Sequence, residues 1–243
     1  MTTISDTRPA ITAPDARKLA PLAGILAGPL FLTTVALLTW AEAGYMHRLG
    51  WRYTKNNNVP WPSGLALGPD GWIQIVNFAI TGQLVLTLVV GGLRHHLHRL
   101  SGKIALALLT VLGAALTVSA FPTDHGAAAG KNPNTWHGWI HSAAFVGVAV
   151  PAIVGPVFVA LALRRDPSWR PLPALSALVP PLLVGAFIAQ HALHDVAFTG
   201  FLVIVFAWLA ALAGRLRRFD ANSVGPSEGA NCGAGATKLR LGT

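Results

Sequence analysis

Cysteine and charge are what this sequence of 243 residues has least of. The single cysteine, Cys232, has no second thiol in the chain for a disulfide, and it excludes a multi-cysteine metal site. Only 11% of the residues are charged, against about 25% in a typical soluble domain. The composition therefore argues against a soluble globular protein.

Long stretches without Asp, Glu, Lys or Arg fill most of the chain, and each can form a helix that crosses about 30 Å of hydrocarbon. We therefore predict an all-α, polytopic membrane protein with a six-helix domain over residues 19–218. Its predicted transmembrane helices are 19–41, 72–93, 104–121, 138–163, 171–190 and 196–214. Pro180-Pro181 is expected to bend or break the fifth helix. The polar flanks, 1–18 and 219–243, are predicted to be a disordered arm and a disordered tail.

The net charge of +9 would suggest a nucleic-acid partner in a soluble protein, but here it predicts an orientation in the membrane. If the N-terminus is cytoplasmic, few of the 18 Lys and Arg residues fall outside: Arg48, Arg52, Lys55 and Lys131. We predict cytoplasmic termini and a multi-pass protein of the cell membrane that contacts membrane lipids and no nucleic acid. Ala41-Glu42-Ala43 resembles a signal-peptide cleavage site, but the apolar run before it is longer than a signal core, which favours a retained helix.

Acidic and histidine side chains gather at the predicted outer ends of the helices, although the orientation rule concerns only Lys and Arg. They are Glu42, His47, Asp70, Asp124, His125, His137, His141, His191, His194 and Asp195. Ionisable groups at the edge of a bilayer are costly and often functional. The alternative is structural, since an Asp at a helix start is often a cap and an Asp–His pair can lock two helices together.

The spacing of these residues is compatible with two kinds of chemistry. His137 and His141 are four residues apart and His191 and His194 three apart, so each pair can share a helix face and, with Asp195, hold a divalent metal such as zinc. Alternatively, Asp124, His137 and His141 form a catalytic acid/base set. Two histidines from facing helices could instead ligate a haem iron.

Polar residues also line one face of the second predicted helix. Gln74 and Asn77 lie at helical spacing, and with Asp70 and Glu42 at the outer end they form a predicted substrate-binding set. Hydrogen bonding that only joins helices is the alternative. Asp70 is expected to cap this helix, and the preceding loop, 42–71, is either a lid over the site or an ordinary connection.

The segment Arg94-His95-His96-Leu97-His98-Arg99 contains three histidines but is flanked by arginines that would repel a metal cation. We interpret it as a solvated basic end of the second helix that touches anionic lipid.

Phe121-Pro122-Thr123-Asp124, followed by His137-Gly138-x-x-His141, resembles the membrane family catalogued as domain of unknown function 998. The segment from Leu65 to Gly82 resembles its first outer loop and second helix, and the likeness extends over about residues 20–215. The resemblance implies a six-helix architecture with Asp124, His137 and His141 at the motif positions, and it implies no reaction. This chain departs from the family pattern at Phe198-Thr199-Gly200, where the family has a Glu-Arg or Gln-Arg pair.

Three functions are compatible with the sequence. The first is a membrane-embedded enzyme that carries out hydrolysis or an acid/base rearrangement on a lipid-like or isoprenoid substrate. The second is a small-molecule transporter or resistance protein, although no acidic residue lies at mid-membrane and no internal repeat is evident. The third is a non-catalytic structural subunit of the membrane.

Overall fold

The computed structural model describes residues 16–49, 61–125, 135–193 and 195–223, without the side chains of residues 16, 190–196 and 220–223. Within those ranges all regular secondary structure is helical. The elements are α1 (Ala16–Ala41), α2 (Ala43–Arg48), α3 (Pro62–Leu65), α4 (Gly71–Leu86), the π-helical η1 (Thr87–Gly92), the 3₁₀-helical η2 (Leu93–His95), α5 (Leu100–Val118), α7 (Trp136–Leu163), the 3₁₀-helical η3 (Pro167–Trp169), α8 (Leu172–Leu193) and α9 (Asp195–Ser223).

In the described part of the chain six helices are long and apolar enough to cross a membrane, which confirms the predicted all-α fold with six transmembrane helices. They cover Arg17–Ala41, Gly71–His95, Leu100–Val118, Trp136–Leu163, Leu172–Ala189 and Ala197–Phe219. The predicted arm and tail, 1–18 and 219–243, lie largely outside the described residues. Of the predicted bend or break at Pro180-Pro181, the break does not occur, since α8 continues through both prolines. Pro180 and Pro181 have no backbone N–H group, so α8 lacks two hydrogen-bond donors. Its packing between α7 and α9 stabilises the helix despite this loss.

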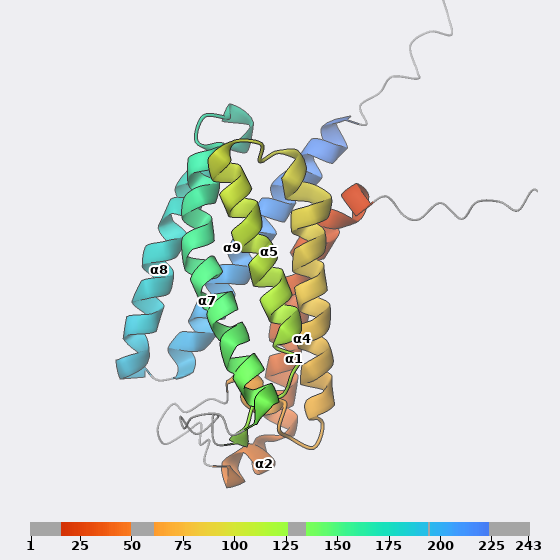
Figure 1. The fold of residues 1–243 in the computed structure, drawn as a ribbon, viewed down its shortest axis with the longest axis vertical. Coiled ribbons are helices and arrows are strands. Elements are labelled where there is room, and N and C mark those ends of the chain that lie inside the picture. The colour runs from red at the N-terminus through yellow and green to blue at the C-terminus, as the bar shows by residue number, and fades with distance from the viewer. Residues whose placement is uncertain (1–15, 50–60, 126–134, 194, 224–243) are drawn as a thin grey trace, which may run out of the picture.

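The six long helices form a closed ring in which each packs against its sequence neighbours and α9 returns to α1 (Figure 1). Fully buried leucines such as Leu88, Leu109 and Leu209 fill the interior. Large apolar side chains such as Leu178 and Phe187 of α8 remain exposed on the outside, as they would against lipid.

Small residues allow α1 to lie close to α9, as the spacing of Gly24 and Gly28 suggests. A Cβ atom added at Gly24 would lie 2.6 Å from the Cβ of Ala213, and one at Gly28 would lie 2.7 Å from the Cβ of Phe206. These contacts close the ring between its first and last helices.

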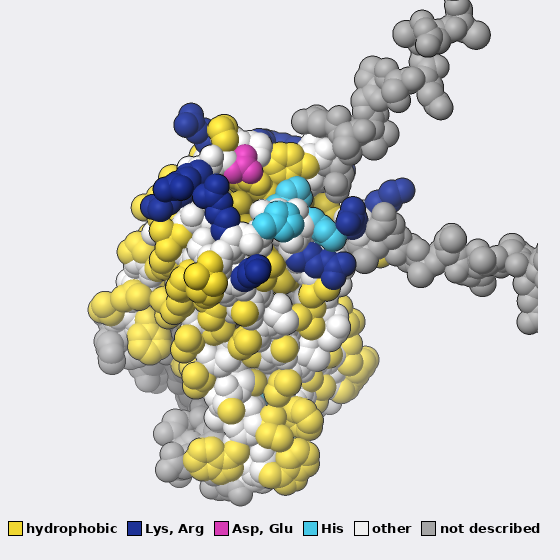
Figure 2. All heavy atoms as spheres, turned by 45° about the horizontal axis from the view of Figure 1, so that its top comes forward, with side chains coloured by type: hydrophobic (Ala, Val, Ile, Leu, Met, Phe, Trp, Pro, Cys, Tyr) yellow, Lys and Arg dark blue, Asp and Glu magenta, His cyan; other side chains and the backbone are white. Residues whose placement is uncertain are grey.

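The two ends of the ring differ in charge. The start of α1, the end of α9, η2 and η3 lie at one end, and α2, α3, the end of α5 and the start of α7 lie at the other (Figure 1). We call these the basic end and the α2 end. Figure 2 shows Lys and Arg side chains gathered at the basic end around histidines, and Asp166 is the one acidic side chain described there. This is the asymmetry that the orientation rule requires, while the cytoplasmic location of the termini stays a prediction.

Candidate site at the α2 end: a clasp between α5 and α7 and an aromatic pocket

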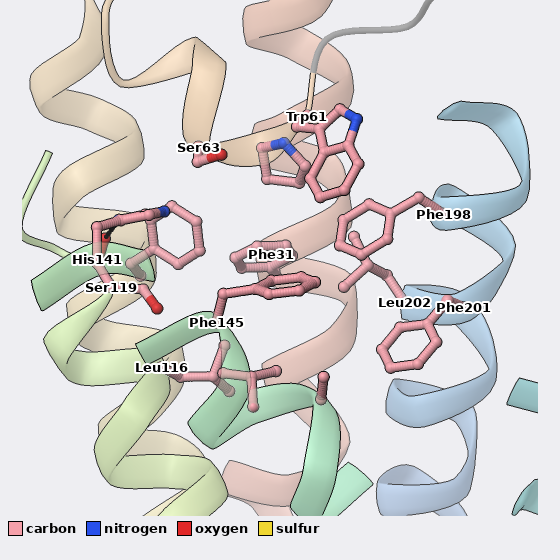
Figure 3. A pocket seen from close by; sticks show the side chains of 14 residues that line it. Phe31, Trp61, Ser63, Leu116, Ser119, His141, Phe145, Phe198, Phe201 and Leu202 are labelled. Atoms are coloured by element: carbon pink, nitrogen blue, oxygen red, sulfur yellow. Dashed lines mark hydrogen bonds between the residues drawn. The ribbon is translucent and has the colours of Figure 1, made fainter. Parts of the chain in front are cut away.

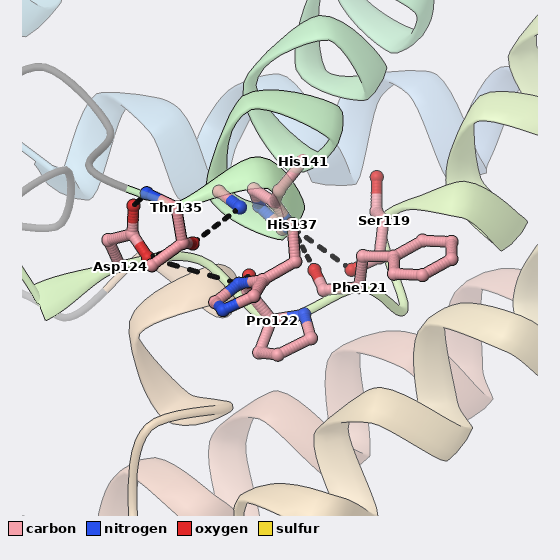
Figure 4. Close-up of polar contacts among 8 residues, drawn as sticks. Ser119, Phe121, Pro122, Asp124, Thr135, His137 and His141 are labelled. Carbon is pink, nitrogen blue, oxygen red and sulfur yellow. Dashed lines mark hydrogen bonds and ion pairs between the residues drawn. The ribbon is translucent and has the colours of Figure 1, made fainter.

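Asp124 joins the end of α5 to the start of α7. Its Oδ2 accepts a hydrogen bond from the Thr135 backbone N–H at 3.0 Å, and its Oδ1 accepts one from Thr135 Oγ1 at 2.6 Å (Figure 4). Thr135 is the N-cap of α7, and its Oγ1 accepts the Gly138 N–H at 3.2 Å. The buried carboxylate therefore reinforces the cap and places negative charge at a helix N-terminus, where it is favourable.

Gly138 is the glycine of the His-Gly-x-x-His motif, and it lies directly against the Asp124 carboxylate. A Cβ atom at this position would overlap both carboxylate oxygens. The motif therefore needs a glycine here for Asp124 to reach its position.

The two motif histidines bind the carbonyl groups that follow α5. His137 Nδ1 lies 2.9 Å from the Pro122 carbonyl oxygen and 3.8 Å from Asp124 Oδ1. His141 Nδ1 lies 3.1 Å from the Ser119 carbonyl oxygen and 2.7 Å from that of Phe121 (Figure 4). A carbonyl only accepts, so Nδ1 is the donor in both rings. They satisfy carbonyl groups of the segment after Val118, the last residue of α5.

The structure thus brings the predicted set Asp124, His137 and His141 to one helix junction. We call these three residues together with Thr135 the clasp. Their catalytic role stays a prediction, because the bonds above also have a direct structural purpose.

An apolar pocket lies beside His141, inside the ring at the α2 end (Figure 3). It has about 510 Å³ of empty space, part of it open to solvent. Its lining comes from α1, α3, α4, α5, α7 and α9: Phe31, Trp61, Pro62, Ser63, Phe78, Leu116, Ser119, His141, Phe145, Val148, Ala149, Phe198, Phe201 and Leu202. Sites for small molecules commonly have such a mainly apolar lining with few polar groups.

Trp61 closes the pocket on the side of α3. Its ring stacks on that of Phe198 from α9, with centroids 4.6 Å apart, and lies 5.9 Å from the ring of Phe145 in α7 (Figure 3). Trp61–Ser63 of the predicted loop thus line the pocket, whereas residues 50–60 lie outside the described residues, and the choice between a lid and an ordinary connection stays a prediction.

His141 is the ionisable side chain in the pocket lining. Nδ1 of His141 carries a proton, which it donates to the carbonyl oxygens that follow α5. Nε2 of the neutral ring is therefore an acceptor. Ser119 also lines the pocket, but its Oγ donates to the Ala115 carbonyl oxygen at 2.9 Å. Opposite these polar groups stand Phe198, Phe201 and Leu202 of α9 (Figure 3).

The polar face of α4 lies in the interface with α1 and does not line this pocket. Asn77 Nδ2 donates to the Phe31 carbonyl oxygen at 3.3 Å and to Gln74 Oε1 at 3.1 Å, and Thr81 Oγ1 donates to Asn77 Oδ1 at 3.4 Å. Gln74 is fully buried, and its Nε2 has no hydrogen-bond partner among the residues described. The role of Gln74 and Asn77 in substrate binding stays a prediction.

Glu42 and Asp70 connect the end of α1 to the start of α4. Glu42 Oε1 accepts the Asp70 backbone N–H at 2.7 Å, while Oε2 is buried without a partner in the described part of the chain. Burial raises the pKa of Glu42; the hydrogen bond from Asp70 opposes this rise and the charge of Asp70 adds to it. Asp70 occupies the N-cap position of α4, but the expected side-chain cap is absent because its side chain makes no capping bond. The role of both residues in substrate binding is untested.

The metal prediction stays open. No group of three or more His, Cys, Asp or Glu residues in the described ranges could hold a metal ion. The side chains of His191, His194 and Asp195 lie outside those ranges. His47 and His125 are exposed at the α2 end.

Sequence reasoning missed the aromatic residues of the pocket. Phe145, Phe198 and Phe201 lie within apolar helices, where an inward-facing ring has the same local pattern as a ring that faces lipid. The one available signal was Trp61, an aromatic residue next to Pro62 in the polar loop 42–71.

Comparison with known proteins identifies a family and no characterised relative. No curated protein and no solved structure matches the chain. A family model described as "Protein of unknown function (DUF998)" matches residues 25–213, a range that begins within α1 and ends within α9. The match covers most of the chain, includes the clasp and agrees with the resemblance seen in the sequence. The chain therefore belongs to the DUF998 family of proteins of unknown function.

Proposed function

We propose that this membrane protein binds a lipid-like molecule in the aromatic pocket at the α2 end, and that His141 binds the polar group of that molecule. The observation that carries the proposal is an apolar pocket whose lining includes an imidazole with its Nδ1 already fixed by backbone carbonyls. Nε2 then remains to accept a hydrogen bond from a ligand.

The lining favours a mostly apolar ligand with one hydroxyl group. Phe31, Phe145 and Phe198 offer large apolar surfaces, and aromatic rings bury much area for little loss of conformational entropy. In so apolar an environment a hydroxyl group would lose free energy without an acceptor, and Nε2 of His141 supplies one. A long-chain or isoprenoid alcohol fits this description.

Enzymatic conversion of the ligand is a second candidate, favoured by the fixed tautomer of His141. An imidazole held through Nδ1–H can take a proton at Nε2 from a bound hydroxyl or water. Asp124 and His137 would then position the helix end to which His141 is bound. Incubation with an isoprenoid alcohol followed by product analysis separates the two candidates, since a binding protein returns the alcohol unchanged.

The pocket is tested by photolabelling of the full chain in lipid nanodiscs with a long-chain alcohol that carries a diazirine. Val148→Trp fills the pocket, whereas Val146→Trp places the same bulk on a side chain that is 57% exposed on the outside of the same helix. We expect Val148→Trp to abolish labelling of α7 and α9 and Val146→Trp to leave it unchanged. Equal labelling of both variants would refute binding in the pocket.

The polar contact is tested by His141→Asn, because the Asn amide nitrogen can replace Nδ1 toward the α5 carbonyls while Nε2 is lost. The unmodified protein should bind the alcohol about tenfold more tightly than the matched hydrocarbon, which corresponds to one hydrogen bond in an apolar site. His141→Asn should remove that preference at unchanged thermal stability. A preference that survives the substitution would exclude His141 as the acceptor.

A further inference from the structure

A second cleft lies at the opposite, basic end, between α1, the end of the α4–η1–η2 segment and α9. It has about 670 Å³ of empty space, including space open to solvent. Arg17, His95 and His96 supply its polar side, and Pro21, Leu216 and Phe219 supply its apolar side. We call it the basic cleft.

The basic cleft lies where three membrane-crossing helices reach their ends. The first candidate span begins at Arg17, the second ends at His95 and the sixth ends at Phe219. These residues therefore share the level at which the hydrocarbon of a bilayer gives way to phosphate groups. At that level a phospholipid has a phosphate group next to its acyl chains. The cationic side of the cleft matches the phosphate, and the apolar side matches the acyl chains.

Two arginines point at one imidazole beside the cleft. Arg17 Nη2 lies 3.3 Å from His95 Nδ1, and Arg94 Nε lies 3.2 Å from His95 Nε2. A guanidinium only donates, and a neutral imidazole accepts at only one of its two nitrogens. At least one of these two contacts therefore brings a donor against a donor, and both place a guanidinium beside the imidazole at the cleft.

The described charged side chains around the cleft are mainly cationic, and the exception is Asp166, which interacts with His96 and Arg215. Lys18, Arg217 and Arg218 are exposed at this end, which Figure 2 shows to be rich in Lys and Arg. Asp166, the acidic side chain described here, accepts bonds from the Ser168 backbone N–H and Oγ.

The wall between the helices is tightly packed. The chain is π-helical from Thr87 to Gly92, a form that is often found at functional sites. A Cβ atom at Gly92 would lie 2.8 Å from Leu216 Cδ1 and 3.1 Å from the Cβ of Ala20. The glycine thus lets η1 contact α1 and α9 at once, which fixes the position of His95 relative to Arg17.

We infer that the basic cleft binds the phosphate of an anionic phospholipid, with Arg17 and His95 toward the phosphate and Leu216 and Phe219 toward an acyl chain. The inference is independent of the proposed function, because this cleft and the aromatic pocket share no residue. Basic pockets between transmembrane helices suit such headgroups.

Native mass spectrometry of the purified full-length protein tests the inference with phosphatidylglycerol and phosphatidylcholine of identical acyl chains. We expect phosphatidylglycerol to bind at least fivefold more tightly at low salt and the preference to shrink as salt is added. Inorganic phosphate at the same concentration should fail to displace the lipid, because it lacks the apolar contacts. Equal affinity for the two lipids, or displacement by phosphate alone, would overturn the proposal.

Substitutions test whether the phospholipid binds at the basic cleft. Arg17→Gln should weaken binding of phosphatidylglycerol about fivefold, the effect of one basic residue at a membrane surface, and Arg17→Lys should retain most of the affinity. Arg165→Gln removes an equal charge from an exposed position at the same end that does not line the cleft, and should change the affinity less than twofold. Equal losses for Arg17→Gln and Arg165→Gln would show a diffuse charge effect and contradict a built site.

Discussion

The polar side chains at the two ends of this bundle differ in their burial. At the α2 end, Glu42 and Asp124 are buried and accept hydrogen bonds from the chain itself. At the basic end, Arg94, Arg165 and Arg218 are exposed. Buried polar groups at the α2 end hold helix junctions together and shape the pocket, whereas most of the described Lys and Arg side chains at the basic end are exposed.

The comparison between the two ends changes the interpretation of the motif that contains Asp124, His137 and His141. Asp124, His137 and His141 invite an interpretation as catalytic residues, but their shortest contacts are to the backbone that links α5 to α7. His141 differs from the other two because it also lines the pocket. The motif therefore builds the junction and places one imidazole in the lining of the pocket.

Removal of the Asp124 carboxylate should have the largest effect on stability. Asp124→Ala deletes both acceptors of Thr135, and two hydrogen bonds to a buried charged group contribute about 3 kcal/mol together. We expect the melting temperature in detergent to fall by about 6–12 °C. The exposed Asp70, whose side chain makes no capping bond, is the matched control, and Asp70→Ala should shift it by less than about 2 °C.

Arg165→Ala provides the counterpart at the basic end and should also leave the melting temperature nearly unchanged. Losses of similar size for Asp124→Ala and Arg165→Ala would remove the contrast between the two ends.

A methyl group at Gly138 should have the next largest effect. Gly138→Ala drives a Cβ atom into the Asp124 carboxylate, and overpacking of this kind costs about 1–3 kcal/mol. Gly185→Ala is the control, because a Cβ atom there has no neighbour within 4 Å. Thermal unfolding of both variants checks the prediction, which fails if Gly138→Ala is as stable as Gly185→Ala.

The pH dependence of Glu42 should be the smallest of these effects. Burial raises its pKa above the ordinary 4.5, so the folded protein holds this proton more tightly than the unfolded chain does. The resulting stabilisation is complete below pH 4.5 and is lost as the pH rises through the folded value. Glu42→Gln keeps an acceptor for the Asp70 N–H and cannot titrate.

We therefore expect the melting temperature of the unmodified protein, relative to that of Glu42→Gln, to decrease from pH 4.5 toward neutral pH. Parallel profiles of the two proteins would show that the Glu42 carboxyl has the same affinity for protons in the folded and unfolded states.

The fold could be predicted from the sequence because each transmembrane helix is encoded locally, by an apolar run bounded by charges or turn residues. The close contacts of Gly24 and Gly28 were also predictable, since their spacing selects one helix face. The gathering of Asp124, His137 and His141 followed from their places on either side of a single connection.

The pocket could not be predicted, because its walls come from six helices and depend on which face of each one turns inward. Phe198 and Trp61 are far apart in the chain, and only the return of α9 to α1 and α3 makes them stack. The hydrogen-bond partners of the polar groups could not be predicted either. Nothing in the sequence shows that His141 binds the carbonyl oxygens of Ser119 and Phe121.

The most direct test of the proposal that the aromatic pocket binds a lipid-like molecule is the position of the photolabel on the unmodified protein. After irradiation with the diazirine-bearing alcohol in nanodiscs, peptide mass spectrometry should locate the label on Phe145–Ala149 of α7 and Phe198–Leu202 of α9, the segments that line the pocket. Label confined to the exposed outer residues of α8, such as Leu178, Leu182 and Phe187, would mean that the alcohol meets this protein only as bulk lipid.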